Sequence, residues 1–180
     1  VYYAGHGIQV DGQNYLLPTK EVFESEQDVK DFALPVKSII DYLKLEIKQS
    51  KDKQLNILVL DACRNNPFES QWDMSRSLDG GNGLAKIPPP RGSLIAFSTD
   101  AGTKAKDGEG ENSLYCISLV KNMLKKNQSI FEVFGKVREE VELKTNGTQS
   151  PVEENKLKGD IWCFSGDCKP KKGIDFLKIF

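Results

Sequence analysis

The chain of 180 residues has almost no charge imbalance and no long apolar run. Its 25 basic and 26 acidic residues nearly cancel, so net charge indicates neither a nucleic-acid surface nor a polybasic membrane anchor. The longest apolar runs are far shorter than the roughly 20 residues that cross a bilayer, and the start shows no signal-peptide pattern. These absences predict a cytoplasmic protein that binds neither nucleic acid nor membrane.

Cysteine and histidine are also scarce. The four cysteines do not have the spacing of a small disulfide scaffold, and Cys116 falls within a helical pattern, so we expect reduced thiols. His6 is the only histidine in the chain. A thiol that acts as a nucleophile needs a base, and this sequence offers one imidazole for that role.

An apolar run at residues 57–60 is followed directly by polar residues. The run has the length and composition of a strand buried on both faces of a mainly parallel sheet. Cys63 comes three residues after this run, and reactive groups collect at the carboxyl ends of such strands. A second β-rich run, residues 1–7, carries His6 between two glycines. If the two strands are neighbours in the sheet, Cys63 and His6 form a Cys/His dyad.

Five motifs occur in order along the chain, at residues 3–7, 60–64, 92–99, 105–108 with 112–113, and 145–151. Together they resemble the caspase-like cysteine peptidases, within them the metacaspase, orthocaspase and paracaspase branch. The resemblance implies an α/β fold, a three-layer αβα sandwich of the caspase–hemoglobinase type around a mainly parallel sheet. It predicts a peptidase domain at residues 1–165 and a tail of unknown role at 166–180.

The chain begins without methionine, inside the expected histidine strand. In the caspase-like fold about two strands and at least one helix precede that strand, so we expect an N-terminally incomplete domain. The preceding segment would then be another chain or a cleaved piece. The length favours one domain, and 38% hydrophobic residues are enough for one sizeable core.

The chemistry that this resemblance implies is acyl transfer. Cys63 would attack the scissile carbonyl, while His6 stabilises the thiolate and then protonates the leaving amine. The resemblance places the oxyanion between the backbone amides of Cys63 and Gly7. A glycine at position 7 suits this role because it has no Cβ and permits close approach. No cofactor is required for this chemistry.

Specificity depends on the residue two places before the nucleophile. Caspases that cleave after aspartate carry glutamine there, whereas this chain has Asp61. Metacaspases and paracaspases also carry aspartate there and cleave after arginine or lysine, and paracaspases add an acid where Asp107 falls. The resemblance therefore implies peptide or protein substrates with a basic residue before the scissile bond, held by Asp61, Asp107 and Ala4. A bidentate carboxylate–guanidinium pair would favour arginine.

Alternative interpretations of the two acids and of the domain's function remain open. Asp61 could be a strand-end turn cap, and Asp107 an ordinary loop acid. The domain could be a catalytically silent scaffold, although His6 and Cys63 argue against this, or a thiol hydrolase that acts on nonpeptide esters or amides and does not need Asp61.

An acidic, turn-rich segment at residues 19–34 is expected to form a solvent-exposed connection. Metacaspases often bind calcium near this region, so calcium is a possible activator. The segment lacks the alternating ligand pattern of a calcium loop, and we therefore assign no metal-binding residues.

The remaining periodicity predicts the other elements of the fold. Residues 69–91 are expected to form a long mobile loop, in which a protease specific for basic residues could cut at Arg76, Lys86 or Arg91. The predicted elements are a hairpin with a turn at 11–13, a helix at 36–47, a strand at 94–97, helices at 114–124 and 129–141, and a last strand at 159–164.

Overall fold

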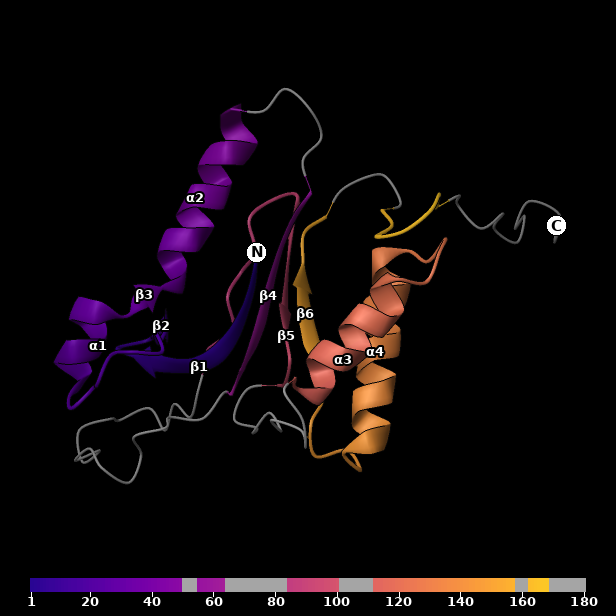
Figure 1. Ribbon diagram of the computed structural model, residues 1–180. Helices are drawn as coiled ribbons and strands as arrows, with labels where there is room; N and C mark the ends of the chain where they lie inside the picture. Colours follow the sequence, from indigo (N-terminus) through magenta and orange to yellow (C-terminus); the bar gives the residue numbers. More distant parts are fainter. Residues whose placement is uncertain (50–54, 64–83, 101–111, 158–161, 169–180) are drawn as a thin grey trace, which may run out of the picture.

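The computed structural model describes residues 1–49, 55–63, 84–100, 112–157 and 162–168, without the side chains of 46–49 and 63. Within these ranges a six-stranded sheet has the order β3-β2-β1-β4-β5-β6 (Figure 1). The strands are β1 (Tyr2–Val10), β2 (Gln13–Leu16), β3 (Leu34–Pro35), β4 (Asn56–Cys63), β5 (Ser93–Phe97) and β6 (Val152–Asn155). The helices are α1 (Glu26–Phe32), α2 (Val36–Gln49), α3 (Leu114–Met123) and α4 (Ile130–Lys144).

The centre of the sheet is parallel and its margins are antiparallel. β4 pairs in parallel with both β1 and β5. At the margins, β2 pairs antiparallel with β1, and β6 pairs antiparallel with β5. All five residues of β5 are buried, as expected for a strand that is covered on both faces.

Helices cover both faces of this sheet (Figure 1). Side chains alternate along each strand, so β4 and β5 supply a different hydrophobic cluster on each face. One cluster joins α2 to the sheet and includes Val36, Ile40, Leu58, Leu60 and Ile95. The other joins α3 and α4 to the sheet and includes Val59, Leu94, Ala96, Leu119, Phe134 and Val137. The predicted three-layer αβα fold is confirmed.

Local signals in the sequence account for several of these elements. Asp11 and Gly12 have φ values of 49° and 72°, the left-handed conformation that a tight two-residue hairpin turn requires. α4 begins with the predicted capping box, in which Ser129 and Glu132 bond each other's backbone amides. Among the helices that the structure describes, none is long and apolar enough to span a membrane.

Residues 19–34 are mostly exposed, as expected, but they form more than a simple connection. The segment contains α1 and β3, and α1 begins with a capping box between Ser25 and Asp28. Val29 is fully buried, in a cluster that joins α1 to the β1–β2 hairpin. The segment has few apolar residues and many carboxylates, so its periodicity did not reveal that it packs on the hairpin.

The last strand was also predicted in the wrong place. The edge strand is β6, whereas residues 158–161 lie outside the described residues and Cys163 forms one isolated bridge with Ser129. β6 has the polar sequence Val-Glu-Glu-Asn, and its Glu153 forms an ion pair with Arg138 of α4. A strand held partly by an ion pair lacks the apolar alternation on which the prediction relied.

The predicted mobile loop is partly ordered. Residues 64–83 lie outside the described residues, but residues 84–91 pack on the domain. Leu84 is 1% exposed, and Ala85 exchanges two hydrogen bonds of 2.8 Å with the side chain of Asn14. One buried leucine and one buried amide therefore attach this segment to β2.

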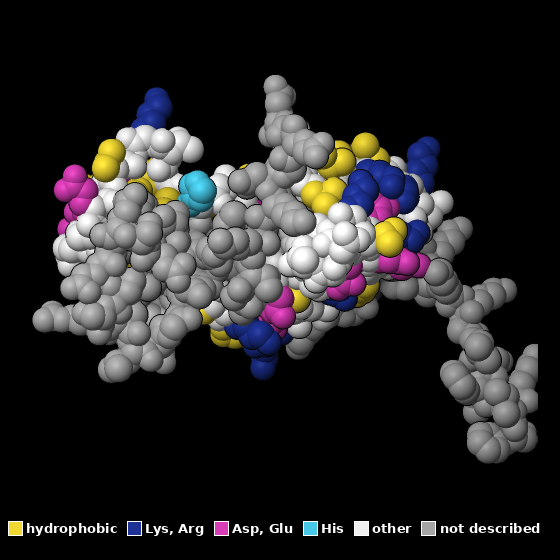
Figure 2. All heavy atoms as spheres, turned by 90° about the horizontal axis from the view of Figure 1, so that it is seen from below, with side chains coloured by type: hydrophobic (Ala, Val, Ile, Leu, Met, Phe, Trp, Pro, Cys, Tyr) yellow, Lys and Arg dark blue, Asp and Glu magenta, His cyan; other side chains and the backbone are white. Residues whose placement is uncertain are grey.

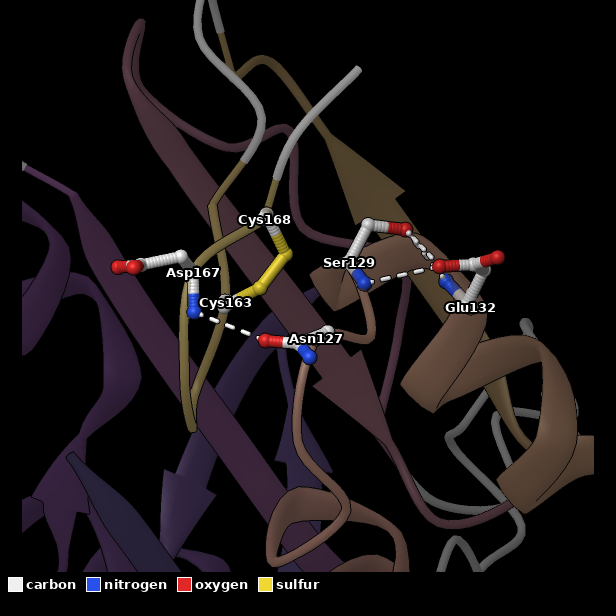
Figure 3. Close-up of a disulfide and its surroundings, with 6 residues drawn as sticks. All are labelled: Asn127, Ser129, Glu132, Cys163, Asp167 and Cys168. Atoms are coloured by element: carbon white, nitrogen blue, oxygen red, sulfur yellow. Dashed lines mark hydrogen bonds between the residues drawn. A yellow bond between two sulfur atoms is a disulfide. The ribbon is translucent and has the colours of Figure 1, made fainter. Parts of the chain in front are cut away.

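Two cysteines expected to be reduced form a disulfide (Figure 3). Cys163 and Cys168 have Cα atoms 5.6 Å apart, close enough for a bond because the chain turns back at Gly166, where φ is 75°. Asn127 binds the turn at both ends, donating from its amide to Ser165 and accepting from Asp167 at 3.0 Å. The disulfide crosses the predicted boundary at residue 165, and the two hydrogen bonds of Asn127 fix this segment to the α3–α4 connection.

Candidate active site at the end of the parallel strands

Strands β1 and β4 bring the predicted dyad positions together. In their parallel register Ala4 lies opposite Asp61, and His6 lies opposite Cys63. Register partners on adjacent strands project their side chains to the same face, and adjacent strands lie about 4.8 Å apart. Positions 4, 6, 61 and 63 therefore share the face of the sheet that carries α3 and α4.

The sequence suggested that His6 ends its strand, but β1 continues to Val10, and His6 lies where β1 changes its partner strand. Residues up to His6 pair with β4, and Gly7 onward pairs with β2. The His6 carbonyl already accepts a hydrogen bond from the Leu17 amide, at 2.9 Å. Its side chain is exposed, and Figure 2 shows it at the surface when the molecule is seen from below.

Tyr3 supports the backbone of His6, a role that motif spacing did not reveal. The Tyr3 hydroxyl lies 2.8 Å from the carbonyl oxygen of His6 and 2.9 Å from that of Leu17. It crosses Gly5, where a Cβ would lie only 2.7 Å from the hydroxyl oxygen. Burial raises the pKa of Tyr3 more than the Leu17 bond lowers it, so the hydroxyl remains a donor. A glycine at position 5 is therefore required for the Tyr3 hydroxyl to reach the His6 carbonyl.

Position 7 has no room for a side chain, and the Gly7 amide points toward β4. Because the His6 carbonyl faces β2, the backbone groups of the next residue face the opposite edge, where β4 ends. The absent side chain leaves room for Leu84, whose carbons would lie 2.9–3.0 Å from a Cβ. The sequence suggested that this space admits substrate, but Leu84 fills it.

Asp61 is 6% exposed and joins three elements. The Tyr2 hydroxyl donates to its Oδ2 at 2.9 Å, and the Ser113 hydroxyl donates to the same oxygen. Ser113 is also the N-cap of α3, where it accepts from the Cys116 amide at 2.9 Å. Sequence analysis identified Asp61 but neither of its partners, because Tyr2 and Ser113 meet it only in the folded chain.

The Tyr2 hydroxyl is held in its protonated form. Burial, a hydrogen bond with the Cys116 thiol and the negative charge of Asp61 all raise its pKa. Tyr2 therefore donates to Asp61 throughout the physiological pH range. Cys116 itself is a free, partly exposed thiol in the first turn of α3.

A buried amide supports the other side of β4. Gln149 is fully buried and donates from Nε2 to the Ser98 carbonyl at 2.9 Å. Ser98 follows β5, and its amide donates to the Leu60 carbonyl at 3.0 Å. This network connects the loop after α4 to the strand that leads to Cys63, so the motif at residues 145–151 supports the site.

Some predicted residues cannot be placed. Asp107 and Arg76 lie outside the described residues. The Lys86 side chain is 74% exposed, 3.9 Å from the Glu154 carboxylate, and Arg91 is exposed in the turn that precedes β5. Within the described ranges, no group of three or more His, Cys, Asp or Glu side chains could hold a metal ion. Calcium activation stays a prediction.

Comparisons with known proteins agree with this arrangement. The family model described as "Caspase domain" matches residues 1–161. A solved structure, caspase-1 from Spodoptera frugiperda, superposes with a TM-score of 0.53 at 15% sequence identity. The match covers 76% of this chain and 57% of that caspase, so the chain spans little more than half its length. No curated protein sequence matches the chain. At this identity the structural likeness establishes the fold.

Proposed function

The chain belongs to the caspase domain family, a family of cysteine peptidases, and from this premise we propose that it cleaves peptide bonds after arginine or lysine through Cys63 and His6. One observation carries the proposal: His6 and Cys63 are direct partners in the parallel register of β1 and β4. Two residues 57 positions apart in the sequence thus share one face of the sheet. A nucleophile and its base must be this close to exchange a proton.

The proposed reaction is a two-step acyl transfer. The Cys63 thiolate attacks the scissile carbonyl, and the carbonyl oxygen takes the negative charge of the tetrahedral intermediate. His6 then gives its proton to the leaving amine, which leaves an acyl-enzyme. Water, deprotonated by His6, releases the acid and restores the thiol. The amides of Gly7 and Cys63 are the proposed oxyanion donors, since position 7 directs its amide toward the end of β4.

Asp61 is the proposed recognition group for the basic side chain. Its carboxylate lies on the same face as His6, two residues before Cys63 along β4. Its partner Ala4 has a small, exposed side chain, which leaves space beside the carboxylate. Asp107 remains part of the proposal as a second acid, on the family resemblance alone.

Three otherwise identical fluorogenic peptides, ending in arginine, lysine or aspartate, test this function. The wild type is expected to cleave the two basic peptides, and Asp61→Asn to lose roughly ten- to a hundredfold in kcat/KM for them. Preference for the aspartate peptide would overturn the specificity. No turnover of any peptide, with or without calcium, would favour a silent scaffold, and turnover of nonpeptide esters alone would favour a general thiol hydrolase.

Self-processing within residues 69–91 is a second part of the proposal. The exposed side chains of Lys86 and Arg91 support it, but the bonds between Ala85 and Asn14 hold the chain near Lys86. A protease needs an extended, freely accessible segment, so we expect cleavage after Lys86 to be slow. Intact-mass measurement of wild type beside Cys63→Ala would identify the fragments, and an uncut wild type under activating conditions would exclude processing.

A further inference from the structure

The hydrogen bonds around Asp61 bear on how a basic side chain is recognised, and this inference rests on the proposed function. Both hydroxyl donors, from Tyr2 and Ser113, reach Oδ2. Among the described residues, no hydrogen bond reaches Oδ1. A carboxylate oxygen has two lone pairs, so two donors saturate Oδ2 and leave Oδ1 as the oxygen with capacity for a further partner.

The two donors come from different elements of the fold. Tyr2 lies on β1, diagonal to Asp61 across the strand pair, within the reach of an aromatic side chain. Ser113 lies at the N-cap of α3, where its oxygen is itself fixed by the Cys116 amide. Two donors from separate elements prevent the carboxylate from turning about its Cβ–Cγ bond.

We propose that Tyr2 and Ser113 are positioning residues for basic-side-chain specificity, which hold Oδ2 of Asp61 so that Oδ1 alone meets the substrate cation. A guanidinium needs both carboxylate oxygens for a fork-shaped pair, whereas an ammonium is a point charge that needs one. End-on binding through Oδ1 removes the geometric advantage of arginine. The wild type therefore cleaves lysine and arginine peptides with similar kcat/KM.

Tyr2→Phe tests this with the loss of one hydroxyl. The lysine peptide is expected to lose roughly tenfold in kcat/KM, through KM, because the carboxylate is less firmly oriented. The arginine peptide loses less, because the freed lone pair on Oδ2 accepts a second guanidinium N–H. The ratio of arginine to lysine cleavage rises while kcat stays unchanged. Tyr42→Phe, which removes an exposed hydroxyl on α2, is the matched control and leaves the ratio unchanged.

Ser113→Ala needs a control for the loss of its helix cap. Ser129→Ala removes the equivalent N-cap of α4, which has no hydrogen bond to Asp61. Both alanine variants are expected to lower the melting temperature to a similar extent, and only Ser113→Ala raises the ratio of arginine to lysine cleavage. Ser113→Thr keeps the hydroxyl and restores the wild-type ratio.

The outcomes separate the two proposals. A wild type that cleaves after basic residues, with an unchanged ratio in Tyr2→Phe and Ser113→Ala, overturns this inference and leaves the proposed function intact. The same holds for a wild type that prefers arginine over lysine by more than about tenfold. A wild type that cleaves neither basic peptide overturns both.

Discussion

His6 and Cys63 are register partners on β1 and β4, at the position where β4 ends and β1 changes its partner strand. His6→Ala and Cys63→Ala should each reduce kcat/KM by about a thousandfold or more, because either change removes the nucleophile–base pair. Neither change should unfold the domain, because the His6 side chain is exposed and Cys63 is the last residue of β4. Peptide turnover, with thermal unfolding as the control, measures both effects. A kcat/KM of Cys63→Ala near that of the wild type would show that Cys63 is not the nucleophile.

Gly7 and Leu84 should be coupled in stability. Gly7→Ala places a Cβ within 2.9–3.0 Å of the buried Leu84 side chain and should cost about 1–3 kcal/mol of unfolding free energy. In a Leu84→Ala background the same change should cost less, because the obstructing carbons are gone. Denaturant unfolding of the four proteins in this cycle measures the coupling energy. Strictly additive costs would show that Leu84 does not restrict position 7.

The Cys163–Cys168 disulfide should contribute about 2 kcal/mol to stability, the amount expected for closing a very short loop. Cys163→Ser should lower the unfolding temperature, and a reductant should lower that of the wild type by a similar amount. Cys116→Ala keeps the disulfide and should respond to the reductant as the wild type does. If the reductant destabilised Cys163→Ser equally, its effect on the wild type would not come from this disulfide.

Stability should fall in acid partly through Glu140. Burial opposes its ionisation, but hydrogen bonds from Lys121 and Ser118 hold its pKa at about 2, below the ordinary 4.5. A lowered folded-state pKa stabilises the fold above pH 4.5, and this contribution is lost as pH falls from 4.5 toward 2. The side chains are partly exposed, so solvent screening limits the contribution to about 1 kcal/mol.

Glu140→Gln should therefore be less stable than wild type at pH 7 and nearly equal to it at pH 2. Glu139→Gln removes the same charge from an exposed position on α4 and serves as the control. Urea unfolding between pH 2 and 7 gives the comparison. Parallel pH profiles for wild type and Glu140→Gln would exclude the linkage.

The sequence by itself was sufficient to predict those elements that depend on residues close together in the chain. The apolar run before Cys63 predicted β4, the Asp11–Gly12 turn predicted the hairpin, and the Ser129–Glu132 pair predicted the start of α4. Backbone sterics, capping and hydrophobic alternation act over a few residues, so their effects can be predicted directly from the amino-acid sequence.

Tertiary structure decided what depends on contacts between distant residues. It placed His6 beside Cys63, saturated Oδ2 of Asp61 with Tyr2 and Ser113, and filled the space over Gly7 with Leu84. It also joined two cysteines that spacing alone indicated to be reduced. A register or a shared carboxylate oxygen exists only once strands and helices have packed, because packing determines which side chains, far apart along the chain, come within hydrogen-bonding distance.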